Sequence, residues 1–183
     1  DEFKYRKWLF SAGLRASLYR SENISRFAWE PRLKINTFIG EKDKLMLAYD
    51  RMYQPVHTIN EIDYNAKTDY WVPFRENILP QSDQISVGWK NYTNEHLTLS
   101  IEAYYKSMRN LLLIRNLEYY LDAHSDYAQG KGVSMGVEFM AEYGRGAFTG
   151  WVSYTLSQSR RTFGGRSYPF KYDAPHDLSA FAG

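Results

Sequence analysis

The residues of this sequence with side chains suited to catalysis or metal binding are few and scattered. Its four histidines are His57, His96, His124 and His176. None has a second ligand two to four residues away on a defined element, which is the spacing that zinc sites use. His176 precedes Asp177, but no serine or cysteine elbow accompanies the pair, so a hydrolase triad is not predicted. Cysteine is absent, which excludes disulfides and thiolate metal ligands. From these residues together we expect no catalytic residue, no metal and no cofactor.

Two further patterns could carry chemistry but have simpler structural explanations. Glu61 and Asp63 form a carboxylate pair, yet they lie in an expected loop with no apolar pocket that would raise a carboxyl pKa. The glycines at 144–146 and 164–165 suit turns rather than phosphate-binding loops, because no helix is expected after them. The sequence therefore predicts a protein that is not an enzyme.

Aromatic and basic side chains gather in or next to three stretches that we expect to be long loops, at 55–82, 110–131 and 160–175. If these loops meet at one end of the fold, their rings and guanidinium groups could stack on sugars or hold anionic groups. The competing explanation is that the loop aromatics pack on one another and order the loops. The candidate ligand-binding residues are Tyr53, His57, Tyr70, Trp71, Tyr119, Tyr120, Arg160, Arg161, Tyr168 and Tyr172.

The elements that must position these residues are strands, because apolar and polar residues alternate with period two. The alternation covers eight segments, at 8–18, 27–39, 44–50, 84–90, 97–106, 133–142, 148–157 and 178–182. No window keeps the apolar spacing of a helix. Pro31 interrupts the second segment and cannot donate to a strand ladder, so we expect a bulge or a strand end near it.

The connections between these segments are sorted by length. Tight turns are expected near 40–43, 91–95 and 143–146, and the three long loops alternate with them. In an antiparallel up-and-down meander this order places all tight turns at one end and all long loops at the other. Bacterial outer-membrane barrels have this asymmetry, so we expect an all-β fold that forms part of a transmembrane β-barrel.

Alternation alone does not say which face of the sheet is wet, and a soluble β-barrel or sandwich that binds a ligand remains the alternative. Strands of about ten residues, mixed polar rows and aromatics at strand ends favour lipid. The longest aliphatic run is 111–114, far short of a membrane-spanning helix. A net charge of +2 gives no reason to expect a nucleic-acid partner. No signal peptide is present and the last alternating segment stops abruptly, so we expect a piece of a longer protein.

Several motifs of this sequence resemble those of one family, the Bacteroidetes-type TonB-dependent outer-membrane receptors. The clearest are IEAYYKSMRNL at 101–111, GKG at 130–132 leading to GVE at 136–138, TGWVSYTLS at 149–157, and YP with YDAPHDL at 168–178. Residues 49–57, 70–73 and 77–84 are similar to strand-to-loop passages of the same family. The resemblance covers the chain from about residue 10, and the order and spacing of the motifs make it specific.

This resemblance implies a barrel of about 22 strands in the bacterial outer membrane, of which residues 1–183 supply about eight. It also implies that the family's N-terminal plug domain and C-terminal strand lie outside this segment. The expected partners are outer-membrane lipid, TonB through that plug domain, and a nutrient that the sequence does not identify. A surface lipoprotein is a further partner that the resemblance implies. The expected function is TonB-energised nutrient uptake, with ligand contacts from the long loops.

Overall fold

The computed structural model describes residues 1–21, 24–63, 66–74, 78–114 and 127–183. Its elements in these residues are all strands, which confirms the expected all-β class. They are β1 (Glu2–Tyr5), β2 (Trp8–Ser21), β3 (Ile24–Ile39), β4 (Asp43–Tyr53), β5 (Val56–Asp63), β6 (Ala66–Pro73), β7 (Gln81–Tyr92), β8 (Leu97–Ile114), β9 (Tyr127–Arg145), β10 (Phe148–Phe163), β11 (Arg166–Pro169) and β12 (His176–Ala182). Within the described part of the chain, no helix is long and apolar enough to cross a membrane.

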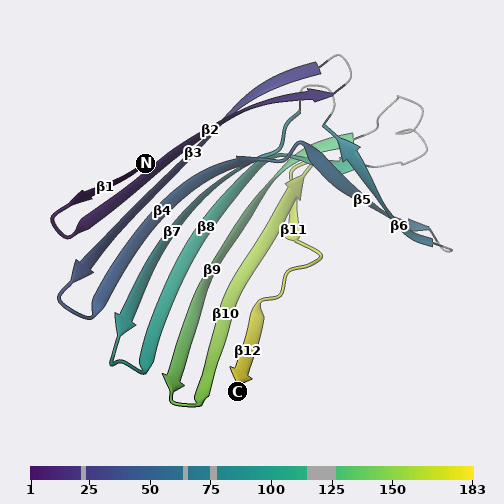
Figure 1. Cartoon of the computed structure of the whole chain (residues 1–183). Coiled ribbons are helices and arrows are strands. Elements are labelled where there is room, and N and C mark those ends of the chain that lie inside the picture. The colour runs from purple at the N-terminus through teal and green to yellow at the C-terminus, as the bar shows by residue number, and fades with distance from the viewer. Residues whose placement is uncertain (22–23, 64–65, 75–77, 115–126) are drawn as a thin grey trace.

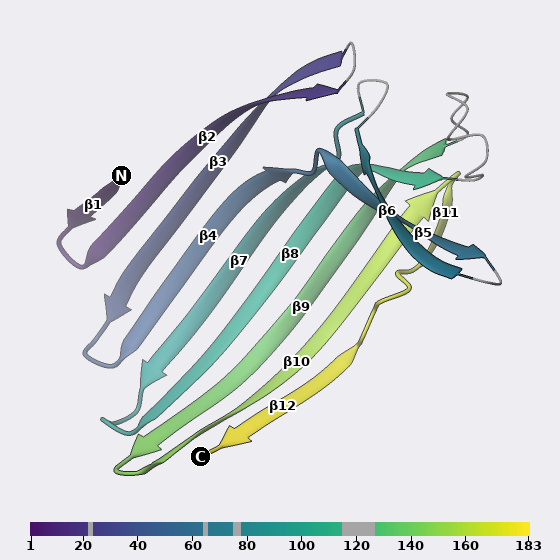
Figure 2. The same cartoon turned by 45° about the vertical axis from the view of Figure 1, so that its right-hand side comes forward.

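Ten of the strands form one antiparallel sheet in the order β1-β2-β3-β4-β7-β8-β9-β10-β11, with β12 also paired to β10. Strands that are neighbours in the chain are neighbours in the sheet, with two exceptions. A separate hairpin of β5 and β6 is inserted between β4 and β7, and β11 and β12 both pair with β10 rather than with each other. The sheet curves like part of a barrel wall (Figures 1 and 2). No pairing among the described residues joins its first and last strands. The predicted meander is therefore confirmed as an open segment of wall.

One face of this sheet is apolar across its whole width, and we call it the apolar face. The ladder sets Ile101 opposite Trp89 on one side and Phe139 on the other, and Phe139 opposite Tyr154. The predicted rows of β8 and β9 share this face, because Leu99, Ala103 and Tyr105 pair with Ala141, Val137 and Met135. Large side chains on it are exposed, such as Leu14, Val87 and Phe139. The opposite face, which we call the polar face, carries side chains such as Arg15, Lys34 and Glu102.

The three predicted tight turns, which follow β3, β7 and β9, lie at one end of the sheet and the long connections at the other (Figure 1). Two short reversals also lie at the loop end: Ser21 of β2 pairs with Ile24 of β3, and Gly164 and Gly165 join β10 to β11. Gly40 and Gly146 have φ angles of 80° and 61°, which glycine adopts without strain, and each lies in a tight turn. The turn ends are also staggered (Figure 1). Trp8, Leu45 and Tyr154 belong to one paired row. On β2 this row lies directly next to a turn, whereas on β10 it lies several residues along the strand from the turn. Stagger of this kind is what closure of a tilted barrel requires.

The strands extend beyond the segments in which the sequence alternates. Strand β8 continues to Ile114, β10 continues to Phe163, and β11 pairs with the end of β10. The stretch 55–82, expected to be a loop, contains the β5–β6 hairpin. Alternation depends on one face being apolar, whereas ladder hydrogen bonds need only backbone groups. The ladder can therefore continue where apolar side chains stop.

Pro31 does not interrupt β3 on its β2 side, where pairing runs from Ile24 to Thr37 without a register shift. No bulge is seen there. On the β4 side, pairing begins only at Arg32, next to the proline, which agrees with its missing donor. Above this point β2 and β3 diverge from β4 (Figures 1 and 2), and we call this opening the β3–β4 fork. The one irregularity that the strand registers record lies in β8, between Met108 and Leu111.

A small core fills the fork. Ala28, Phe74 and Leu79 are buried, and Tyr19, Ile24 and Tyr53 pack against them. Phe74 and Leu79 come from the segment between β6 and β7, so this core attaches the hairpin connection to β2 and β3. Most of the remaining large apolar side chains are exposed, as expected for a wall that needs lipid to cover it.

Candidate functional site

The base of the β5–β6 hairpin is fixed to the loop end of the sheet by backbone hydrogen bonds. The Phe74 N–H donates to Pro55 O at 2.8 Å, and the Gln54 N–H donates to Pro80 O at 3.0 Å. With Phe74 in the fork core, the hairpin begins from an anchored base. The direction in which it leaves the sheet is therefore determined by packing.

A buried carboxylate closes the polar side of the fork. Glu30 is 2% exposed. Its oxygens accept hydrogen bonds from the Tyr53 N–H at 3.1 Å and the Ser17 hydroxyl at 3.4 Å, and pair with Arg15 Nε at 3.2 Å. The Tyr53 N–H lies where β4 has lost its pairing with β3, so the Glu30 side chain takes the place of a strand partner.

The candidate ligand residues of the first long connection fall in different settings. Trp71, on β6 opposite Thr58, is 72% exposed. Tyr53 is half-buried against the fork core, so part of its ring is used for packing. His57 and Tyr70 lie on β5 and β6, but their side chains are outside the described part of the structure. The second connection contributes nothing to this comparison, because Tyr119 and Tyr120 also lie outside the described residues.

The third connection is ordered by contacts among its own side chains. Arg161 lies 4.3 Å from the Phe170 ring centroid, and Phe170 meets Tyr172 edge-on at 5.4 Å. Tyr168 stacks on Phe163 at 6.3 Å between centroids. Self-packing therefore accounts for part of this aromatic content. Tyr172 nevertheless remains 68% exposed and Tyr168 40% exposed, which leaves ring surface for a ligand.

Arg160 and Arg161 project to opposite faces because they are consecutive in one strand. Arg160 pairs with Val133 and continues the row of the apolar face. It also donates to the Ser167 hydroxyl at 3.3 Å and the Ser167 carbonyl at 3.4 Å. Arg161 continues the polar face and is half-buried. Of the two arginines, only Arg161 lies on the face that a barrel turns inward.

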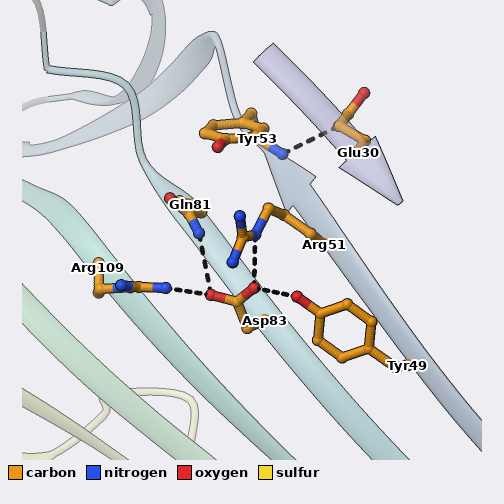
Figure 3. A network of polar contacts seen from close by, with 7 residues as sticks. All are labelled: Glu30, Tyr49, Arg51, Tyr53, Gln81, Asp83 and Arg109. Atoms are coloured by element: carbon orange, nitrogen blue, oxygen red, sulfur yellow. Dashed lines mark hydrogen bonds and ion pairs between the residues drawn. The ribbon is translucent and has the colours of Figure 1, made fainter. Parts of the chain in front are cut away.

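Sequence reasoning missed the densest polar cluster, which surrounds Asp83 (Figure 3). Oδ1 of Asp83 accepts from Arg51 Nε at 2.6 Å and the Tyr49 hydroxyl at 2.8 Å. Oδ2 accepts from Gln81 Nε2 at 3.0 Å and from the Arg109 guanidinium. We call these five residues the Asp83 cluster, and they join β4, β7 and β8.

The position of this cluster is unusual because it lies on the apolar face, at the loop end. Arg51 and Asp83 are register partners, and they continue the rows of Tyr49 and Ile85. Arg109 pairs with Gln81. It belongs to the same row of β8 as Tyr105 and Ser107, and it lies two residues beyond Ser107. The signal was present in the sequence as charged residues that keep the parity of the apolar rows. It falls outside the segments chosen for their apolar alternation.

The described residues at the loop end offer groups suited to binding. No group of three or more His, Asp or Glu side chains that could hold a metal occurs among them. What the loop end presents is exposed rings, half-buried arginine and backbone groups on anchored hairpins, which suit stacking and hydrogen bonding to a captured molecule.

Comparison with known proteins identifies one family. A protein-family model described as "TonB dependent receptor-like, beta-barrel" matches residues 1–182, which is nearly the whole chain. A search of curated proteins finds no match.

Proposed function

Since the chain belongs to the family of TonB-dependent receptor-like β-barrels, an outer-membrane family, we propose that it forms part of the wall of a receptor that imports a nutrient with energy delivered through TonB. The loop end faces the outside of the cell, and the turn end faces the periplasm. The ligand contacts made by this segment come from the three long connections.

The observation that carries this proposal is the sorting of the connections. The turns after β1, β3, β7 and β9 all reverse the chain at one end, and exposed aromatic side chains such as Trp71 and Tyr172 come from the long connections at the other end. These residues lie beyond the apolar rows, so contact with lipid does not explain them. Capture of a ligand by ring stacking does.

Membership of an outer-membrane family decides against the soluble alternative. A soluble barrel would bury its apolar row, whereas here large side chains of that row, such as Leu14 and Val87, are exposed. In the membrane this row contacts lipid chains, and the polar face lines the interior.

The partners that we propose for this receptor rest on its family and on the open, apolar sheet. Outer-membrane lipid covers the apolar face. Further strands complete the barrel, because the described sheet is open at both edges. A plug domain carried elsewhere in the same protein contacts TonB, and a surface lipoprotein assists capture of the nutrient.

The test uses the full receptor in its own cells. The nutrient is first identified as the one whose uptake is lost when the gene is deleted. Trp71→Ala, Tyr172→Ala and Arg161→Ala are then compared singly with the control Tyr5→Ala, an exposed ring at the turn end. Loss of a stacking contact should weaken nutrient binding by about two- to tenfold at normal surface expression.

The control should bind normally, because Tyr5 lies at the opposite end of the sheet. Normal binding in all three loop variants would overturn the assignment of ligand contacts to this segment. Uptake that persists without TonB would overturn the proposed energy source.

A further inference from the structure

On six strands the row of the apolar face reaches a charged residue toward the loop end, and five of these six residues are cations. The row of β3 ends in Ser25 instead. The row of β4 runs through Leu47 and Tyr49 to Arg51, and the row of β10 runs through Leu156 and Gln158 to Arg160. The same change occurs on β2, β8 and β9. The cations that end these rows are Arg20, Arg51, Arg109, Lys131 and Arg160, and we call them the basic border. The one acid in the corresponding position is Asp83 on β7, the ladder partner of Arg51.

Asp83 holds two of these cations but does not neutralise them. One carboxylate faces the guanidinium groups of both Arg51 and Arg109, so the three side chains together keep one positive charge. The bonds to Asp83 use a single nitrogen of each guanidinium. Each guanidinium has five N–H donors in a planar fork. The Arg109 side chain is 57% exposed and that of Arg51 is 32% exposed, so both can reach a further anion.

The position of the basic border along each strand indicates which part of the lipid it contacts. It directly follows the lipid-facing rows, so its side chains lie where hydrocarbon gives way to headgroups. A charge at that level is stable only if water or an anionic headgroup receives it. Arginine is suited to phosphate, because two of its N–H groups can bind two phosphate oxygens together.

We propose that the basic border is a binding site for the phosphate groups of anionic lipids in the outer leaflet, centred on Arg51 and Arg109. Asp83 has two effects at this site. It holds the two guanidinium groups next to each other, and it competes with the lipid phosphate for their donors. Lys131 and Arg160 extend the site across β9 and β10. This site goes beyond nutrient capture, and it rests on the family, on which face meets lipid and on the proposed outward orientation of the loop end.

A purely structural cluster is the alternative, and two substitutions separate the two explanations. If Arg51, Asp83 and Arg109 only hold β4, β7 and β8 together, Arg109→Gln and Asp83→Asn remove the same contact. Both substitutions then change lipid binding in the same direction. If they bind lipid phosphate, the effects have opposite signs. Arg109→Gln removes a ligand of the phosphate, whereas Asp83→Asn removes its competitor.

The experiment uses the full receptor in nanodiscs of neutral phosphatidylcholine, titrated with lipid A that carries two phosphates. Arg109→Gln should weaken binding by about tenfold, the effect of losing one hydrogen bond to a charged group. Asp83→Asn should tighten binding. The control Lys34→Gln removes an exposed cation from the polar face and should change nothing. Dephosphorylated lipid A should bind weakly to every form.

Parallel losses in Arg109→Gln and Asp83→Asn would overturn the proposal, as would equal binding of dephosphorylated lipid A. Displacement of the lipid by millimolar inorganic phosphate would identify a site for free phosphate instead of a lipid. If Asp83→Asn fails to fold, the double variant Lys131→Gln/Arg160→Gln leaves the Asp83 cluster intact. It should still weaken binding of phosphorylated lipid A, and unchanged binding would overturn the proposal.

Discussion

Substitution of Ile101 by arginine tests the assignment of the two faces most directly. Ile101 is the central residue of the apolar row of β8, which runs from Leu97 to Tyr105. It lines a shallow apolar hollow together with Trp89, Leu99, Phe139, Ala141, Val152 and Tyr154. Its side chain is 38% exposed in the isolated wall, and in the barrel that exposed part contacts lipid.

The expected loss of folding free energy follows from the position of Ile101 in the middle of the lipid-facing row. An arginine on the lipid face at the middle of the bilayer destabilises a barrel by about 2–4 kcal/mol. At the denaturant concentration that half-unfolds the unsubstituted receptor, the folded fraction of the variant is therefore lower by at least an order of magnitude, because 1.4 kcal/mol is a factor of ten. Rotation of the arginine toward a headgroup would lower the cost to the smaller end of this range.

The matched control is Ser100→Arg, one position earlier in the same strand. Ser100 pairs with Lys90 and Met140, and strand geometry turns it to the polar face. We expect it to cost much less than Ile101→Arg, because the barrel interior is wet. The assay is denaturant unfolding of the full receptor in lipid vesicles. Equal costs for the two variants, or a greater cost at Ser100, would refute the assignment of faces.

Three further substitutions test the fork and the close packing of strands. Glu30→Ala should cost about 1–3 kcal/mol, because it leaves the Tyr53 N–H without its acceptor; denaturant unfolding measures it, and a change below a few tenths would show that the carboxylate is dispensable. Phe74→Ala should cost about 3–5 kcal/mol through loss of the fork core, and should speed proteolysis within the β5–β6 hairpin while cleavage elsewhere stays unchanged. Gly136→Ala should lower the melting temperature, because a Cβ there would lie 2.8 Å from a tyrosine ring and 2.9 Å from a backbone oxygen. The control Gly13→Ala, whose Cβ would have its nearest neighbour 3.9 Å away, should not lower it. Equal melting temperatures would contradict this packing argument.

The sequence predicts the lipid-facing part of each strand well, for a physical reason. Where one face meets lipid, every second residue must be apolar, and a shift of one residue would turn a whole row to the wrong face. The rows around Ile101 and Phe139 were therefore correct residue by residue. The turns at Gly40 and Gly146 were also predictable, because each needs a residue that accepts a positive φ.

The loop end was harder to predict because no such constraint acts there. There β11 extends the main sheet and β5 pairs with β6 in a sheet of their own, and the side chains of these strands have no common pattern. The fork depends on Glu30 meeting Tyr53, a contact between strands that the sequence does not reveal. Likewise, Arg51, Asp83 and Arg109 are far apart in the chain, and only the register of three strands brings them together.

Because the turn ends are staggered, residues that are paired in one row of the ladder lie at different depths in the membrane. Adjacent strands lie about 4.8 Å apart, and with a strand tilt of about 40° each step across the ladder climbs roughly 3 Å along the membrane normal. Trp8 and Tyr154 belong to one paired row, yet Trp8 lies near the periplasmic interface and Tyr154 lies well inside the bilayer. Residues at one depth therefore follow a diagonal across the sheet. A lipid carrying a quencher at a fixed carbon would reach residues along that diagonal, and neighbours in the ladder would report different depths.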